Sequence, residues 1–332
     1  MKRLLGALAV VAAIVLACGD RASEPVVQAP RIVESDAPLP QIGHVPAGAI
    51  SPVSSPRVTA PIVGEPPADV RGIFPPPWAV APLSNGSAAP EISAIAAVVV
   101  DEASGAVLYE KDGYRALPPA STTKVATAIL AIEHGGLDER VVTDVDASLM
   151  RRSSVMGLRP EDSFTLRDLL YGLMLPSGND AALAIGRHIS SSDAAFVAEM
   201  NGLLDRLGLD SSHFTNPHGL GNPHHLLTPR DLAILDRYGM TLPEYRDIMK
   251  TYSYQAVGSK AISMVSANSF AFSYPGADSA KIGYTRSAGN TLVASATRNG
   301  HRLYVVVFNT ASRDADAAVL LDWAFANHTW PQ

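Results

Sequence analysis

The sequence predicts a mixed α/β (α+β) fold, in which helices flank an antiparallel sheet and a helical subdomain is inserted between the strands. Three observations carry this prediction. An apolar hairpin pattern occupies residues 93–110, and a series of helical segments follows over residues 121–250. From Tyr252 the hydrophobic period changes to two, which is typical of antiparallel strands.

The composition limits the function. The chain of 332 residues is 47% hydrophobic and 17% charged, so it can bury a substantial core and is not globally disordered. Its net charge is -6 at pH 7, whereas a nucleic-acid-binding protein shows a basic face. We therefore expect no nucleic acid among its partners and favour a small-molecule or polymer substrate.

The first 18 residues have the features of an export signal. Lys2 and Arg3 form a positive segment, and the apolar run 4–16 is too short to span a bilayer comfortably. The run ends at Cys18, the only cysteine, and a small residue before a cysteine resembles a bacterial lipobox. We expect a signal peptide over 1–18, lipid attachment at Cys18, and an exported protein anchored to a bacterial membrane facing the cell wall. An ordinary signal peptide with an incidental cysteine is the alternative.

The next segment predicts a tether rather than a fold. Residues 19–90 contain 15 of the 25 prolines and keep no helical or strand period, which is typical of a semi-extended, disordered linker. The folded domain is then expected over 91–332.

Within that domain, local signals fix the elements in order. Residues 93–100 and 106–110 form the first hairpin, across the turn 101–105. The helices are expected at 121–134, 166–175, 180–189, 193–207, 229–238 and 241–250. The later strands are expected at 252–257, 278–284, 290–298 and 301–309, followed by a closing helix at 315–327. The pair Asn299-Gly300 predicts the turn of the last hairpin.

The start of the first helix contains a candidate nucleophile and base. Ser121 and Lys124 lie three residues apart, so on a helix they share one face and their side chains can meet. A serine becomes nucleophilic when a base lies within hydrogen-bond reach and a third group orients the pair.

Two further motifs extend this pair. Ser177 and Asn179 lie between two helices, where a hydroxyl could pass a proton and an amide could bind a peptide. Lys281 and Gly283 lie on a strand, where the lysine offers a positive charge and the glycine allows a substrate backbone to approach closely. Ser-x-x-Lys, Ser-x-Asn and Lys-x-Gly, in this order, form the three-part set of penicillin-recognising enzymes.

On these motifs the chain resembles the serine-type D-alanyl-D-alanine carboxypeptidases, the low-molecular-weight penicillin-binding proteins. The resemblance covers roughly residues 92–328 and includes the segments 169–174, 214–220, 228–233 and 283–290. It implies a DD-peptidase/β-lactamase-like fold, an acyl-serine mechanism, peptidoglycan stem peptides as substrates and β-lactams as inhibitors. It also implies that no metal or organic cofactor is needed. The neighbouring His213, His218, His224 and His225 lack an accompanying metal motif, so we expect no metal there.

The resemblance assigns the catalytic roles. Ser121 is the acyl-ester nucleophile, and Lys124 is the general base, whose neutral form is favoured by burial and by the charge of Lys281. Ser177 relays a proton to the leaving D-Ala amine, with support from Lys281.

The resemblance also assigns the binding residues. Asn179, Lys281 and Gly283 contact the substrate, and the backbone N–H groups of Ser121 and Tyr284 stabilise the oxyanion. The family usually has threonine where this chain has Ile282, and its hydroxyl helps to bind the substrate carboxylate. We expect its loss to weaken this recognition by about 1–3 kcal/mol. The residues that could compensate are Thr285, Arg286 and, as a weaker candidate, Arg313.

The motifs leave some alternatives open. Endopeptidase action on peptidoglycan crosslinks needs the same residues, and so does a module that binds wall peptides or β-lactams without turnover. The balance of these activities, the rate and the oligomeric state do not follow from the motifs.

Overall fold

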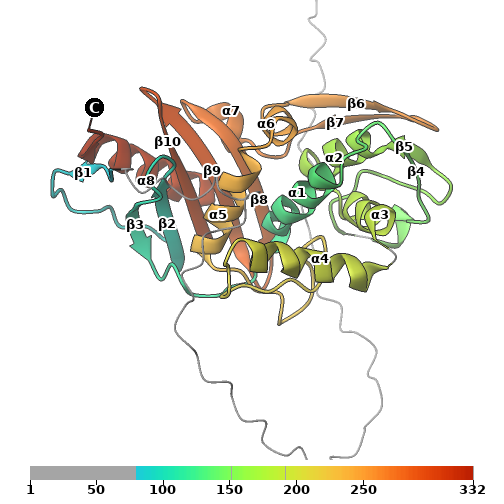
Figure 1. The fold of residues 1–332 in the computed structure, drawn as a ribbon, viewed down its shortest axis with the longest axis horizontal. Helices are drawn as coiled ribbons and strands as arrows, with labels where there is room; N and C mark the ends of the chain where they lie inside the picture. The colour runs from blue at the N-terminus through green and yellow to red at the C-terminus, as the bar shows by residue number, and fades with distance from the viewer. Residues whose placement is uncertain (1–79, 151, 191, 332) are drawn as a thin grey trace, which may run out of the picture. The chain divides into compact units, whose positions relative to one another are not determined.

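The computed structural model describes residues 80–150, 152–190 and 192–331 (Figure 1). The expected signal peptide, Cys18 and nearly all of the expected tether lie outside the described residues. No helix within the described ranges has the length and apolar character needed to cross a membrane.

A five-stranded antiparallel sheet forms the centre of the domain, with the order β3-β2-β10-β9-β8. Its strands are β2 (Ala96–Asp101), β3 (Val107–Lys111), β8 (Ala277–Thr285), β9 (Gly289–Arg298) and β10 (His301–Thr310). β9 and β10 are joined at Asn299 and Gly300, both with positive φ, as the predicted hairpin turn requires. The expected mixed fold with an antiparallel sheet is confirmed, and β8 lies at its edge.

Both faces of the sheet are buried, because successive side chains on a strand point to opposite faces. On β10, Val305 and Val307 belong to the apolar cluster that includes helix α8 (Arg313–Asn327). Val306 and Phe308 belong to the larger cluster formed with the inserted helices. This packing places the sheet between α8 and the helical subdomain (Figure 1).

The inserted subdomain contains six of the expected helices. They are α1 (Lys124–His134), α2 (Leu166–Met174), α3 (Asn179–Ile189), α4 (Asp193–Arg206), α5 (Pro229–Gly239) and α6 (Pro243–Met249). Thr165 caps α2 in a reciprocal capping box with Asp168, and the Thr228 side chain caps α5 ahead of Pro229. A short 3-10 turn, Ala120–Thr123, precedes α1.

The structure also contains elements that the sequence patterns did not indicate. The strand expected at 252–257 is β6 (Ser253–Val257), but it pairs with β7 (Ala261–Val265) in a separate hairpin and not with the main sheet. Further elements that the sequence patterns did not indicate are β4 (Arg140–Val142), β5 (Ser163–Thr165), α7 (Phe270–Ser273), and the pair β1 (Leu83–Ser84) and β11 (His328–Thr329). Since β1 pairs with β11, the fold includes residues ahead of the expected boundary at 90.

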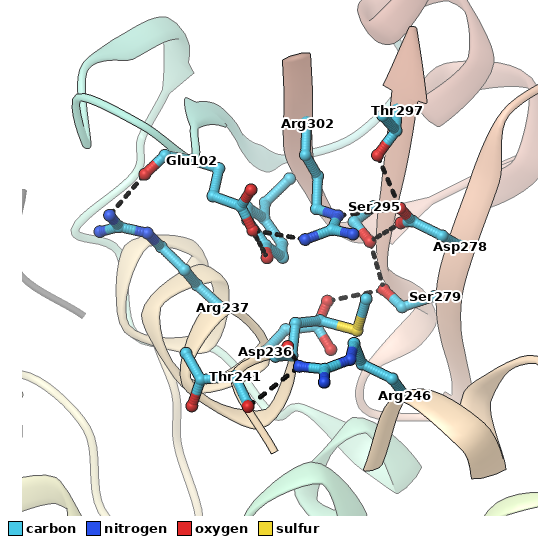
Figure 2. A network of polar contacts seen from close by, with 12 residues as sticks. Glu102, Asp236, Arg237, Thr241, Arg246, Asp278, Ser279, Ser295, Thr297 and Arg302 are labelled. Carbon is cyan, nitrogen blue, oxygen red and sulfur yellow. Dashed lines mark hydrogen bonds and ion pairs between the residues drawn. The ribbon is translucent and has the colours of Figure 1, made fainter. Parts of the chain in front are cut away.

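A buried polar network fixes β8 against α5 and the neighbouring strands (Figure 2). Asp236 on α5 lies 2.8 Å from the Ser279 hydroxyl, which lies 2.9 Å from the Ser295 hydroxyl on β9. Ser295 also contacts Asp278, whose carboxylate accepts a hydrogen bond of 2.8 Å from Arg302 on β10. We call these five residues the support network; Ser279 stands two residues before Lys281 on the same face of β8.

Candidate active site

The first two candidate residues meet at the beginning of α1. The Nζ atom of Lys124 lies 2.9 Å from Ser121 Oγ, and both side chains are buried. Lys124 Nζ also donates to Asn179 Oδ1 at 2.7 Å and to the His218 carbonyl at 3.1 Å. Ala120 has a φ of 50°, so a left-handed residue turns the chain immediately before the serine.

The second motif faces the first across the same site. Ser177 also has a positive φ, 63°, a conformation that stores strain and is concentrated at functional sites. Its Oγ accepts a hydrogen bond of 3.0 Å from Lys281 Nζ. Asn179 begins α3, and its Nδ2 is buried with no hydrogen-bond partner among the described residues. An amide donor left unpaired in this place is available to a substrate carbonyl.

Two lysines, Lys124 and Lys281, share this buried site. Burial lowers the pKa of Lys281 well below its ordinary value, and the charges of Lys124 and Arg313 lower it further. Arg313, at the start of α8, donates to Asn290 at 3.1 Å, and its buried Nε lies 3.4 Å from Asp314 Oδ1 with no hydrogen-bond partner among the described residues. The site is therefore electropositive and suited to an anionic group.

The open edge of β8 lies beside Ser121. A Cβ atom on Gly283 would stand 2.8 Å from the Ser121 nitrogen and 2.5 Å from the Thr291 hydroxyl, so only glycine allows this approach. The Ile282 N–H donates to Asn268 Oδ1 outside the sheet. Because N–H groups alternate sides along an edge strand, the N–H of Tyr284 points to the same open edge.

The side chains of Ile282 and Thr285 are both engaged within the fold. Ile282 is 3% exposed and packs in the α8-side apolar cluster with Phe270 and Tyr274, so its side chain faces away from Lys281. The Thr285 hydroxyl accepts from the Ala288 N–H and pairs with Ser287, which fixes the turn after β8. Both side chains are used within the fold, because residue 282 alternates with Lys281 and residue 285 begins the turn.

Sequence reasoning missed the residues that hold this arrangement. The Thr215 N–H donates to His225 Nδ1, so the ring hydrogen is on Nε2 and is donated to Thr123 Oγ1 at 2.8 Å. Thr123 in turn donates to the Ala120 carbonyl. Burial lowers the pKa of His225 to about 3, which keeps the ring neutral. His225 and Thr123 are 102 residues apart, so no local spacing connects them.

Comparison with known proteins agrees with this geometry. Residues 84–312 match the sequence model of the family described as D-alanyl-D-alanine carboxypeptidase, Peptidase_S11. This chain belongs to that family. It is a family of serine peptidases, so this chain is a hydrolase of that class.

Individual relatives support the assignment. The chain is 36% identical to the D-alanyl-D-alanine carboxypeptidase DacB2 of Mycobacterium tuberculosis over 238 residues, covering 69% of this chain and 81% of that protein. It is 34% identical to DacF of Bacillus subtilis over 245 residues, covering 70% of this chain and 62% of that longer protein.

Solved structures share the fold. The DD-transpeptidase of Streptomyces K15 superimposes with a TM-score of 0.68 and 30% identity, over 72% of this chain and all of that one. A D-alanyl-D-alanine carboxypeptidase of Mycobacterium tuberculosis superimposes with a TM-score of 0.69 and 34% identity, over 75% of this chain and 99% of that one.

Proposed function

We propose that this protein is a serine D-Ala-D-Ala carboxypeptidase that removes the terminal D-Ala from peptidoglycan stem peptides. The observation that carries the proposal is the buried contact of 2.9 Å between Lys124 Nζ and Ser121 Oγ, completed by Asn179, Ser177 and Lys281. Family membership supports the same reaction. The first step releases the terminal D-Ala and leaves an acyl-serine intermediate, from which water releases the shortened peptide and regenerates Ser121.

The contacts of Lys124 orient it as the base. The Asn179 amide oxygen and the His218 carbonyl can only accept hydrogen bonds, so both take hydrogens from the amine. A neutral amine donating twice then directs its lone pair toward the Ser121 hydroxyl. Complete burial of the Lys124 side chain and the charge of the nearby Lys281 both disfavour the ammonium form of Lys124. Ser121 loses its proton to Lys124 as Oγ attacks the carbonyl of the penultimate D-Ala.

The remaining groups act on the leaving group and the oxyanion. Lys281 donates to Ser177, which leaves the Ser177 hydroxyl hydrogen free to reach the departing D-Ala amine. The N–H groups of Ser121 and Tyr284 stabilise the oxyanion beside Gly283. Asn179 Nδ2 binds a backbone carbonyl of the substrate, which adds along the edge of β8 as an extra strand.

The electropositive end of the site receives the terminal carboxylate. Arg313 supports this role, because its charge reaches Lys281. Its Nε makes no hydrogen bond among the described residues, although it lies 3.4 Å from Asp314 Oδ1. Thr285 and Arg286 remain secondary candidates, since the Thr285 hydroxyl already serves the turn. β-Lactams, which carry a carboxylate and a reactive carbonyl, acylate Ser121 through the same contacts.

The decisive experiment is covalent labelling with a fluorescent penicillin. Wild type and Ser211→Ala, in which an exposed serine outside the site is changed, should label, whereas Ser121→Ala should not. Wild type should also release D-Ala from an acyl-Lys-D-Ala-D-Ala peptide. Equal labelling of wild type and Ser121→Ala would refute the mechanism.

Two alternatives use the same acyl-enzyme and differ in the acceptor or the substrate. The similarity to the Streptomyces K15 DD-transpeptidase supports transfer of the acyl group to an amine in place of water. Endopeptidase action would cleave a crosslinked dimer. D-Ala release, amine-dependent product formation and dimer cleavage, measured side by side, distinguish the three. Labelling without any of these products would indicate a module that only binds wall peptides.

We further propose that the protein works outside the cytoplasm, tethered through a lipid on Cys18. The signal-like first 18 residues and the cell-wall activity of the family support this location. Replacement of Cys18 by Ala should move the protein from the membrane fraction to the soluble fraction. Retention of the variant in the membrane fraction would refute the anchor.

A further inference from the structure

Three metal-ligating side chains converge at the ends of α1 and α3 that are remote from the site. His134 is the last residue of α1, His188 lies in the last turn of α3, and Glu139 lies in the loop before β4. One ligand atom from each lies within 4.8 Å of the other two. None of the roles assigned above uses these residues.

The separations suit a tetrahedral metal ion. His188 Nε2 lies 3.5 Å from Glu139 Oε2. Two ligands bound to one zinc ion at about 2.0–2.1 Å with tetrahedral angles lie about 3.3 Å apart. The two imidazole rings lie 6.0 Å apart between centroids and at 73°, so they approach one point from different directions.

Hydrogen bonds fix the backbone of the loop at Glu139. The Glu139 N–H donates to the Gly136 carbonyl at 2.7 Å, and the Glu139 carbonyl accepts from the Leu166 N–H at 3.0 Å. Gly136 has a φ of 60°, and a Cβ there would stand 2.4 Å from Glu139 Oε1. The carboxylate therefore occupies space that only a glycine leaves open.

Two features favour a cation at this point. Both helices direct their C-terminal ends, which carry partial negative charge, toward the cluster. His188 Nε2 is buried and has no hydrogen-bond partner among the described residues, although it faces Glu139. A metal ion would satisfy that atom, and two imidazoles with one carboxylate form a donor set that zinc uses.

We propose that His134, Glu139 and His188 bind one divalent transition-metal ion of the zinc class. The ion fastens together the C-terminal ends of α1 and α3, the two helices whose first residues are Lys124 and Asn179. Since α1 spans ten residue steps, the ion lies about 15 Å along the helix from Lys124. Its role is structural, and it takes no part in the peptidase reaction.

The test is zinc binding to the untagged full chain after chelator treatment, measured by calorimetry with zinc chloride. We expect one zinc ion per chain. Glu139→Gln and His188→Ala should each weaken binding at least about tenfold, whereas His224→Ala, which changes an exposed histidine, should not. Calcium and magnesium, which prefer oxygen ligands, should not compete.

Two further measurements guard against misfolded variants. Zinc at about 100 times its dissociation constant should raise the unfolding midpoint of wild type by roughly 5–10 °C and leave that of Glu139→Gln nearly unchanged. Cobalt bound to wild type should give the visible absorption of a tetrahedral site, and Glu139→Gln should lose it. No zinc binding, or binding unchanged in Glu139→Gln, His134→Ala and His188→Ala, would overturn the proposal.

Discussion

Strand β8 carries two buried polar clusters of opposite character. Around Lys281 two lysines lie in one site, Ser177 is held in a left-handed conformation and Asn179 Nδ2 is unpaired. Around Ser279, two residues earlier, the support network alternates acids, hydroxyls and Arg302, and every member has a partner (Figure 2). The difference separates a site that is prepared for a ligand from a network that holds the strand in place.

The hydrogens of the support network can be counted. If Asp236 is protonated, it donates to Ser279, Ser279 donates to Ser295, and Ser295 donates to Asp278. Each of these three contacts between oxygen atoms then contains one hydrogen. If Asp236 is ionised, the contact of 2.9 Å between the two serines has no hydrogen, because each hydroxyl already donates to a carboxylate. Burial raises the pKa of Asp236 to about 6, so the protonated arrangement predominates below that pH and the ionised one above it.

The largest expected effect is on acylation, and it comes from a change in the cluster around Lys281. Lys281→Met should lower the rate of penicillin acylation by about 10²–10⁴-fold, because the proton relay through Ser177 loses its partner. The free energy of unfolding should fall little or even rise, since a buried and repelled charge is removed. Acylation kinetics and urea unfolding, with the exposed Lys250→Met as the control, measure both quantities. If Lys281→Met instead lowered the free energy of unfolding enough to explain the slower acylation, Lys281 would belong to the stabilising part of β8 and not to the ligand site.

In the support network, removal of a charged side chain should lower the stability of the fold. Arg302→Met leaves the carboxylates of Asp278 and Glu102 without their ion-pair partner. We expect the free energy of unfolding to fall by about 2–4 kcal/mol. Arg159→Met, which removes an exposed pair with Asp146, should lower it by no more than about 1 kcal/mol. Equal effects of the two changes in urea unfolding would show that the network does not stabilise β8.

The titration of Asp236 gives a pH-dependent prediction. Its folded pKa of about 6 lies above the ordinary 3.8, so protonation favours folding. This contribution is complete below about pH 4 and is lost as the pH rises through 6. Between pH 5 and pH 8 wild type should lose about 1–2 kcal/mol more stability than Asp236→Asn, which cannot ionise. Urea unfolding of both proteins at each pH measures the difference, and parallel pH profiles would count against a protonated Asp236.

The smallest effect on acylation is expected at Ile282. Its side chain packs behind β8 with Phe270, so a threonine hydroxyl would enter an apolar cluster. Ile282→Thr should lower the free energy of unfolding by about 1–3 kcal/mol. Its penicillin acylation rate should stay within about threefold of wild type. A tenfold faster acylation would instead show that the hydroxyl reaches the substrate carboxylate, as the family pattern implied.

The sequence predicted the regular parts of the fold because their signals are local. The caps at Thr165 and Thr228 and the turn at Asn299-Gly300 lie next to the elements that they limit. The hairpin partner of β6 was missed, because residues 261–265 are half exposed and carry a weak apolar pattern. β1 and β11 were missed because two-residue strands have no period, and Leu83 and its partner Thr329 are 246 positions apart.

The motifs identified the residues of the site, but their contacts depend on the tertiary structure. Ser121 and Lys124 meet because they lie three positions apart on one helical turn, a spacing that the sequence alone determines. The pairing of Ser177 with Lys281, and of Thr123 with His225, joins residues about 100 positions apart. Only the folded chain decides such contacts, because side-chain direction on a distant strand depends on register and packing. The same reason turned Ile282 away from the site and brought His134 to His188.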